Sequence, residues 1–486
     1  MPNIKFYAIL LVSLLQGLGQ LMAAPVLNSL PTANATILLS FDGHDVNSSM
    51  WNYGIPFSCM PAAMTDVQIT EAFNRVAEDF RPFNINVTTD LTKFLAAPLS
   101  QRVRIIVTPT SAWYAGVAGI AYVTSFTWGD DTPAFVFSDR LVNDPKRVAE
   151  AISHETGHTL GLYHQASYDA NCTLTSSYST GIGTGVTSWG PIMGNAASKN
   201  VTQWNNGATP NGCTFLQDNL SIITTTNGFG YRTDDHADDY RSASTVSITS
   251  SSFSQSGIIS TSTDVDFFNI TLASDGNLKI SASPYSVGPD FSGANLDIKL
   301  MLYNDKGNII STHDVPSTLE IIIDTLLYAG QYYIQIDGTG NINNENDYGS
   351  LGEYTIAGSF TASTITPDPK TDPSNDIKKP KKDKTDLDDI YDADEISSSK
   401  TMNEFGVADK KTSKIFTVIK PFQQPVIIKA TAEYQYMLVD NRGSIIMNGK
   451  EAAGTKNIDI RHLPTGIYTI RLISSKENKT ERFLNK

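Results

Sequence analysis

Residues 154–164 read His-Glu-Thr-Gly-His-Thr-Leu-Gly-Leu-Tyr-His, and this run holds three of the seven histidines in a chain of 486 residues. On a helix, His154 and His158 lie one turn apart on the same face, so both imidazoles can reach one metal ion. Glu155 directly follows the first histidine and can accept a proton from water beside that ion without binding it. The spacing therefore predicts a helix that carries two metal ligands and a general base.

Gly161 is expected to end this helix, because glycine readily adopts the left-handed conformation that turns a chain sharply. The turn would bring His164 back to the same ion as a third ligand. A fourth position would stay open for water, as catalytic zinc sites require. The sequence thus predicts one catalytic Zn²⁺ held by His154, His158 and His164, with Glu155 as the catalytic residue.

This extended motif resembles the zinc-binding signature of the metzincin clan of zinc endopeptidases. Metzincins also carry a methionine turn downstream, and residues 190–194 (Gly-Pro-Ile-Met-Gly) fit it, with Met193 as the structural methionine. Asn195 stands where astacin-like and serralysin-like members have a tyrosine, so the subfamily stays open. The resemblance implies an α+β catalytic domain with a mixed sheet, two main helices and an irregular lower subdomain. It also implies a secreted endopeptidase that hydrolyses peptide bonds in proteins.

Apolar periodicity predicts the elements before the motif. Strands are expected at residues 35–41, 84–88, 102–108, 119–126 and 134–137, and helices at 65–80 and from a cap at Asn143 or Asp144 to about Leu160. This order is similar to a metzincin upper subdomain. The likeness implies that the strand near residues 119–125 edges the cleft and takes up an extended peptide as an added strand. A plain inner strand is the alternative.

The N-terminus has the features of a secretory signal peptide, expected over residues 1–23: Lys5, an apolar stretch at 6–15 and small residues before Pro25. The zinc-peptidase domain is then expected over residues 24–240. No other apolar run is long enough for a membrane helix, so the mature chain is expected to have no transmembrane segment. The formal net charge of −14 argues against nucleic acid as the main partner.

The second half of the chain changes in texture. Short alternating stretches predict a β-sandwich over residues 245–360, which resembles the pre-peptidase C-terminal domain family. Proline, lysine and aspartate dominate residues 361–410 and predict a disordered linker. Residues 411–486 predict a small all-β domain that resembles a type IX secretion sorting domain, with a turn at 441–443 and a Leu-Pro-Thr-Gly-Ile-Tyr segment at 463–468. That resemblance implies export by the type IX machinery of a Gram-negative bacterium, into the medium or onto the cell surface.

Three cysteines allow one disulfide in an oxidising compartment. Cys172 and Cys213 bracket the loop that carries Met193 and are the preferred pair, which leaves Cys59 as a free thiol. His236 lies in the acidic run 234–239 and is a candidate calcium ligand. A solvated acidic loop is the preferred interpretation there, and the same choice applies to His44 beside Asp42 and Asp45.

Two other functions compete with the endopeptidase. The chain could be a non-catalytic surface adhesin, but such relics usually lose a ligand or the glutamate, and all four residues are present. The zinc could instead be structural, but a structural site normally has a fourth protein ligand, and the motif offers none. The sequence therefore favours an enzyme that acts on proteins or peptides.

Overall fold

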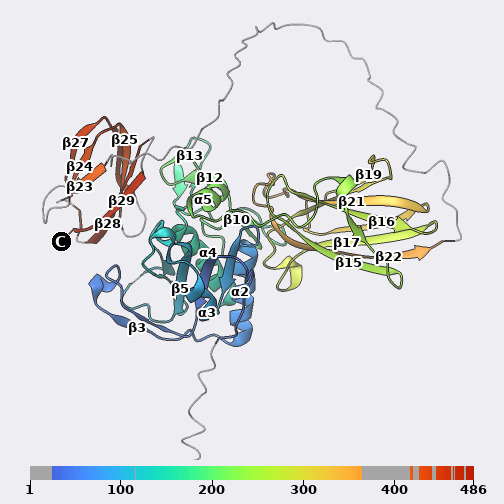
Figure 1. The fold of residues 1–486 in the computed structure, drawn as a ribbon, viewed down its shortest axis with the longest axis horizontal. Helices are drawn as coiled ribbons and strands as arrows, with labels where there is room; N and C mark the ends of the chain where they lie inside the picture. The colour runs from blue at the N-terminus through green and yellow to red at the C-terminus, as the bar shows by residue number, and fades with distance from the viewer. Residues whose placement is uncertain are drawn as a thin grey trace, which may run out of the picture. The chain divides into compact units, whose positions relative to one another are not determined.

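The computed structural model describes residues 24–114, 116–363, 416–419, 426–440, 445–460, 463–464, 466–474 and 478–485. The chain forms two compact units, Met1–Pro369 and Lys370–Lys486, and each is described by itself (Figure 1). The signal peptide expected over residues 1–23, residues 364–410 of the expected linker and the expected turn at 441–443 lie outside the described residues.

The first unit begins with a five-stranded mixed sheet in the order β4-β1-β5-β7-β6. Its strands are β1 (Ala35–Ser40), β4 (Ile85–Thr88), β5 (Arg102–Thr108), β6 (Gly119–Ile120) and β7 (Ala134–Phe137). The first four strands of this order are parallel, and β6 runs antiparallel to β7 at one edge. Their apolar runs are buried on both faces, as parallel strands require.

Four α-helices are present among the described residues: α2 (Asp66–Asp79), α3 (Leu91–Ala96), α4 (Pro145–Thr159) and α5 (Asn219–Thr226). Thr65 caps α2 in a capping box with Gln68, and Asp144 caps α4 through the N–H of Arg147. Helices α2 and α4 pack against each other, and α4 also contacts β5 and β7. This packing fixes α4, the helix that carries the histidine motif.

Short strand pairs and single turns complete this part of the unit. The pairs are β2 (His44–Val46) with β3 (Phe57–Cys59), β8 (Ser167–Tyr168) with β9 (Leu174–Ser176), β10 (Trp189–Pro191) with β11 (Val201–Gln203), and β12 (Asn206–Thr209) with β13 (Gly212–Asp218). The 3-10 turns are η1 (Asn52–Gly54), η2 (Leu99–Gln101), η3 (Ser125–Thr127), η4 (Tyr240–Ser242) and η5 (Pro289–Phe291).

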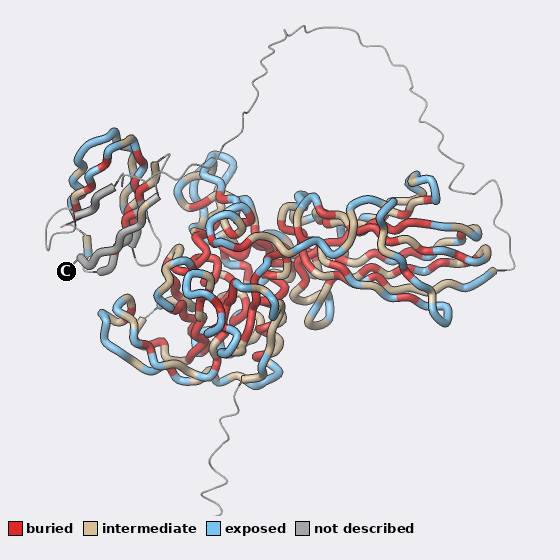
Figure 2. The backbone as a smooth tube through the Cα atoms, viewed as in Figure 1, coloured by how far each residue is buried: buried red, intermediate tan, exposed pale blue. Residues whose placement is uncertain are grey.

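A sandwich of two sheets follows in the same unit, ordered β14-β16-β21-β18-β19 and β15-β22-β17-β20. The strands are β14 (Ser244–Val246), β15 (Ser252–Ile259), β16 (Val265–Leu272), β17 (Gly276–Pro284), β18 (Ile298–Tyr303), β19 (Ile309–His313), β20 (Ile321–Leu327), β21 (Gly330–Gly338) and β22 (Gly352–Ala362). Buried residues alternate with more exposed ones along β17 and β18, so every second side chain points into the sandwich, and Figure 2 shows buried positions along its strands. One continuous core joins this sandwich to the mixed sheet.

The second unit is all β in its described residues. One sheet holds β23 (Phe416–Ile419), β24 (Val426–Ala430) and β27 (Gly454–Ile458), and the other holds β26 (Ile445–Glu451), β25 (Tyr434–Asp440), β28 (Gly466–Ile473) and β29 (Asn478–Asn485). Its core is a separate apolar cluster that includes Ile428, Leu438 and Ile470.

The expected α+β metzincin fold class is wrong. Among the residues that the structure describes, strands make up 41% and helices 15%, so this part of the chain is mostly β. The stretch expected to be an irregular subdomain forms short strand pairs, and the sandwich adds two full sheets. Long amphipathic helices need an extended 3.6-residue periodicity, and α2 and α4 are the two described helices that have it.

The strand expected over residues 119–126 is also shorter than predicted. It ends at Ile120, and the rest of the expected strand contains Thr124, with a φ of 69°, and the start of η3 (Ser125–Thr127). A β-branched residue in the left-handed region cannot continue a strand. The N–H of Thr124 donates to the carbonyl of His158, so this turn packs onto the end of α4.

Candidate metal centre

Helix α4 presents two histidines on one face and orients both through main-chain hydrogen bonds. Nδ1–H of His154 donates to the carbonyl of Ile192 at 2.8 Å, and Nδ1–H of His158 donates to the carbonyl of Leu162 at 2.7 Å. Each bond fixes the tautomer of its ring and leaves Nε2 with a lone pair. The two nitrogens that remain are the ones that can bind a metal.

Gly161 ends α4 as predicted, with a φ of 105°. The N–H of Gly161 donates to the carbonyl of His158 at 2.9 Å, and the N–H of Leu162 donates to the carbonyl of Gly157 at 3.0 Å. This pair of bonds is a Schellman motif, which requires the left-handed residue that glycine supplies. The chain then doubles back and places His164 beside the helix.

The three histidines meet at one point. One ring nitrogen of each lies within 4.8 Å of the others, and the Nε2 atoms of His158 and His164 face each other at 3.0 Å. Burial lowers the pKa of His154, lowers that of His158 well below the ordinary value, and lowers that of His164 to about 3. All three rings are therefore neutral at physiological pH, the form that binds metal ions. This set fits a zinc ion.

Glu155 lies beside the cluster, buried between α4 and the edge strand β6. A Cβ atom on Gly119 would come within 2.7 Å of both Cγ and Oε1 of Glu155. Only glycine leaves room for the carboxyl group there. Burial raises the pKa of Glu155 to about 8. A carboxyl group in this position can exchange protons near neutral pH.

Met193 is fully buried under the helix. A Cβ atom on Gly157 would clash with its Sδ atom, so the methionine packs directly against the α4 backbone. The residue before it, Ile192, carries the carbonyl that orients His154. The turn therefore supports the helix and one of the predicted ligands together.

Tyr178 was missed in the sequence. Its ring centroid lies 4.2 Å from that of His164 and 6.3 Å from that of His154. The comparison with metzincins considered only position 195, two residues after Met193, where Asn195 stands, and so expected no tyrosine near the metal. No fixed spacing marks Tyr178, because packing alone brings its loop to the cluster.

The preferred disulfide, Cys172–Cys213, is confirmed. It ties the segment before Tyr178 to β13. Cys59 is a free, buried thiol on β3, and burial raises its pKa to about 11. Among the described residues it belongs to no cluster of metal ligands.

The acidic run 234–239 does not use its histidine as a ligand. Nδ1 of His236 bonds the Ser244 hydroxyl at 2.7 Å, and Nε2 bonds the Ser256 carbonyl at 2.9 Å. Instead, Asp234 meets two carboxylates of the sandwich, Asp264 and Asp266, within 4.8 Å. Both sandwich carboxylates are buried, whereas Asp234, which the acidic run contributes, is exposed.

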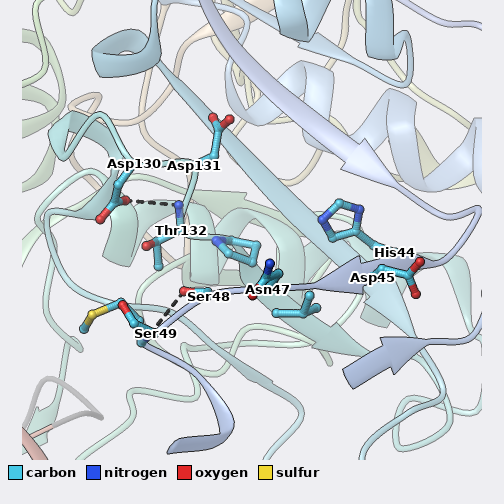
Figure 3. A pocket seen from close by; sticks show the side chains of 11 residues that line it. His44, Asp45, Asn47, Ser48, Ser49, Asp130, Asp131 and Thr132 are labelled. Carbon is cyan, nitrogen blue, oxygen red and sulfur yellow. Dashed lines mark hydrogen bonds between the residues drawn. The ribbon is translucent and has the colours of Figure 1, made fainter. Parts of the chain in front are cut away.

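His44 lines a polar pocket of about 380 Å³ formed with residues 45–50 and 130–133 (Figure 3). The carboxylate of Asp45 accepts from Ser58, and that of Asp42 accepts from the N–H of Ala24. Within the described part of the chain, His44 joins no cluster of three metal ligands.

Comparison with known proteins identifies the C-terminal segment. A family model described as a secretion system C-terminal sorting domain matches residues 420–486. That segment is a type IX sorting domain, as predicted, and it implies the secretion machinery as a partner. The protein is therefore a secreted or cell-surface protein of a Gram-negative bacterium. No helix among the described residues combines the length and apolarity needed to cross a membrane.

Solved structures give only distant matches. The pre-peptidase C-terminal domain of a collagenase from Bacillus anthracis is 15% identical, with a TM-score of 0.18, and the match covers 26% of this chain and 100% of that one. A β-glucuronidase from Faecalibacterium prausnitzii is 10% identical, with a TM-score of 0.13, and the match covers 48% of this chain and 36% of that one. No curated protein matches the chain. These comparisons give no support to a metzincin catalytic domain.

Proposed function

We propose that this protein is a secreted, zinc-dependent endopeptidase that hydrolyses peptide bonds in proteins. The observation that carries the proposal is a cluster of three neutral imidazoles with the buried carboxyl group of Glu155 beside it, packed against Gly119 of the edge strand β6. The likeness of the motif to the metzincin zinc-binding sequence supports the same chemistry.

His154, His158 and His164 would hold the zinc ion. Structural zinc sites normally have four protein ligands, whereas catalytic sites have three and an open position. Within the described residues, this cluster offers three histidine nitrogens and includes no cysteine or carboxylate. The ligand count supports a catalytic site over a structural one.

When bound, the zinc ion supplies a Lewis acid that polarises the scissile carbonyl group and acidifies a water molecule. Glu155 acts as the general base that takes the proton from this water, and then as the general acid that passes it to the leaving amine. Its carboxyl group is held against Gly119 of β6, directly after the ligand His154, where it can reach a water molecule beside the ion. Glu155 is the catalytic residue of the proposal.

The edge strand β6 would hold the substrate. Strand β6 ends the mixed sheet, so an extended peptide can pair with its outer edge through main-chain hydrogen bonds. Gly119 lies on this strand directly against Glu155. A peptide aligned there would therefore run past the catalytic carboxyl group. This placement suits cleavage within a chain.

The test is digestion of a proteome-derived peptide library by the purified full chain, with and without a zinc chelator. Cleavage that stops with the chelator and returns when Zn²⁺ is added back is expected. The cleaved sequences would also define the side-chain preference. Stoichiometric zinc without any cleavage would favour the competing adhesin hypothesis and overturn the enzymatic one.

A further inference from the structure

One residue of the β-sandwich, Asn295, hydrogen-bonds to the elements that support the histidine cluster. This residue is buried, and it lies in the chain between η5 and β18. Its Nδ2 donates to Oδ1 of Asp79 at 2.8 Å, and its carbonyl accepts from Nε2 of Gln203 at 2.6 Å. Asn295 therefore joins the C-terminal end of α2 to β11.

One branch leads from Asn295 to the helix that carries the ligands. Oδ2 of Asp79 accepts from the hydroxyl of Ser153 at 2.5 Å, and both side chains are buried. Ser153 directly precedes His154 on α4. Burial, with the nearby carboxylate of Glu150, raises the pKa of Asp79 to about 8. Both oxygens of the buried Asp79 carboxyl group therefore have a hydrogen-bond donor in this branch.

The other branch leads from Asn295 to the partner of the His154 ring. The carbonyl of Gln203 accepts from the N–H of Ile192 at 3.0 Å. The carbonyl of Ile192 accepts from Nδ1–H of His154 at 2.8 Å. Oε1 of Gln203 also accepts from the indole N–H of Trp189 at 2.7 Å, which fixes the orientation of the Gln203 amide.

The two branches form one closed network, called the circuit here, of Asn295, Asp79, Ser153, Gln203, Ile192 and His154. It holds the backbone of His154 through its neighbour Ser153 and the His154 ring through the carbonyl of Ile192. From this circuit we propose that the β-sandwich positions the metal centre, with Asn295 as the positioning residue. The inference rests on zinc binding by the histidines, as in the proposed function, and does not require peptidase activity. It gives the sandwich a role beyond that of a spacer.

The physical reason is the cost of breaking a buried circuit. Removing the Asn295 amide leaves Oδ1 of Asp79 without its donor in a site that excludes water. Asp79 or Ser153 must then move to find another partner, and the turn of α4 that precedes His154 moves with it. Partners behind metal-binding histidines typically change metal affinity by about 10- to 100-fold when they are removed.

The test compares two buried asparagines of the same sandwich in the full chain. Asn304 is the matched control, because its Oδ1 accepts from the N–H groups of Lys306 and Asn308 in a turn outside the circuit. Zn²⁺ affinity is measured by competition with a chromophoric chelator, and ligand geometry by the absorption spectrum of bound Co²⁺. Asn295→Ala should weaken Zn²⁺ binding about 10-fold and shift the Co²⁺ bands, whereas Asn304→Ala should do neither.

Ser153→Ala tests the same circuit from the helix and keeps a good helix former, so it covers the case in which Asn295→Ala does not fold. The double variant should lose no more affinity than the weaker-binding single variant, because both changes break one circuit. Affinities of Ser153→Ala and Asn295→Ala within twofold of the Asn304→Ala value would overturn the inference. Normal zinc binding without peptide cleavage in the unaltered chain would overturn only the proposed function.

Discussion

Two side-chain clusters of the first unit could each hold a cation, and burial affects them in opposite ways. Among the imidazoles of His154, His158 and His164, burial lowers the pKa and keeps the rings neutral, which is the form that binds a metal. Burial instead raises the pKa of Asp264, and raises that of Asp266 to about 8. A protonated carboxyl group is a poor ligand, so the raised pKa of Asp266 opposes metal binding near neutral pH, whereas the neutral imidazoles favour it.

The largest loss of activity is expected from a change of Glu155, a residue beside the imidazole cluster that has no counterpart at the carboxylate cluster. Glu155→Gln keeps the shape and the three ligands but cannot accept a proton. Peptide cleavage should fall by about 10³-fold, with zinc content unchanged near one ion per chain. Metal analysis and single-turnover kinetics measure the two quantities. Glu345→Gln, an exposed carboxylate outside both clusters, is the control, and equal turnover by both variants would remove the assigned role from Glu155.

His164→Ala tests the imidazole cluster itself. Two histidines should hold zinc more than about 100-fold less tightly than three, a larger loss than removal of an outer-shell partner produces. Chelator competition gives the affinity, and the activity at limiting zinc should fall with it. His236→Ala is the matched control from the carboxylate region, where both ring nitrogens already have partners. If the two variants bind zinc equally well, the turn at Gly161 does not deliver a ligand.

Gly119→Ala should act on Glu155 without touching a ligand. The added Cβ would meet Cγ and Oε1 of Glu155 at 2.7 Å and the carbonyl of Phe135 at 2.9 Å, so the carboxyl group must move. A displacement on the order of 1 Å at a reacting group costs up to about 100-fold in rate. We expect a 10- to 100-fold loss of kcat, with zinc affinity retained. Gly230→Ala, where nothing lies within 4 Å of the added atom, should be neutral. A Gly119→Ala variant that is equally neutral would place Glu155 elsewhere.

The same two clusters mark what the sequence could predict. The imidazole cluster is local, since His154, His158, Gly161 and His164 fall within eleven residues and their geometry follows from one helix and one turn. The carboxylate cluster brings Asp234 of an acidic loop to Asp264 and Asp266 at the start of β16, and no residue spacing in the sequence predicts that contact. Contacts across elements remain invisible until the fold is known. Asn295 and Tyr178 were missed for the same reason.

The elements themselves divide in a similar way. Strands β5 and β7 have the predicted bounds, because uninterrupted apolar runs identify buried strands. Strand β6 ends early, because the packing of Thr124 onto the end of α4 overrides its β propensity. The fold class was wrong because eleven residues of motif implied a class that the other elements do not bear out.

The smallest expected effect concerns the carboxylate cluster and the stability of the first unit without bound cations. Asp266 has an ordinary pKa of 3.8 when unfolded and about 8 when folded, because of burial and the neighbouring carboxylates. The folded state therefore binds more protons than the unfolded state between these values, and stability falls as pH rises from about 4 to about 8. Asp266→Asn cannot ionise and can still accept from the Tyr354 hydroxyl. In the presence of a chelator, the variant should lose less stability between pH 5 and pH 8, by on the order of 1 kcal/mol.

Urea unfolding at the two pH values measures this difference, and Asp324→Asn, on the open face of β20, is the control that should leave it unchanged. An unaltered slope in Asp266→Asn would mean that this carboxylate is ionised in the folded state without a cation.

Repeating the titration with millimolar calcium decides between the two interpretations of the acidic run. If the cluster binds calcium, the ion should stabilise the fold most at pH 8. At that pH the buried carboxyl groups have lost their protons, and the ion can neutralise their charge instead. A cluster that does not bind calcium would show the same pH dependence with and without it.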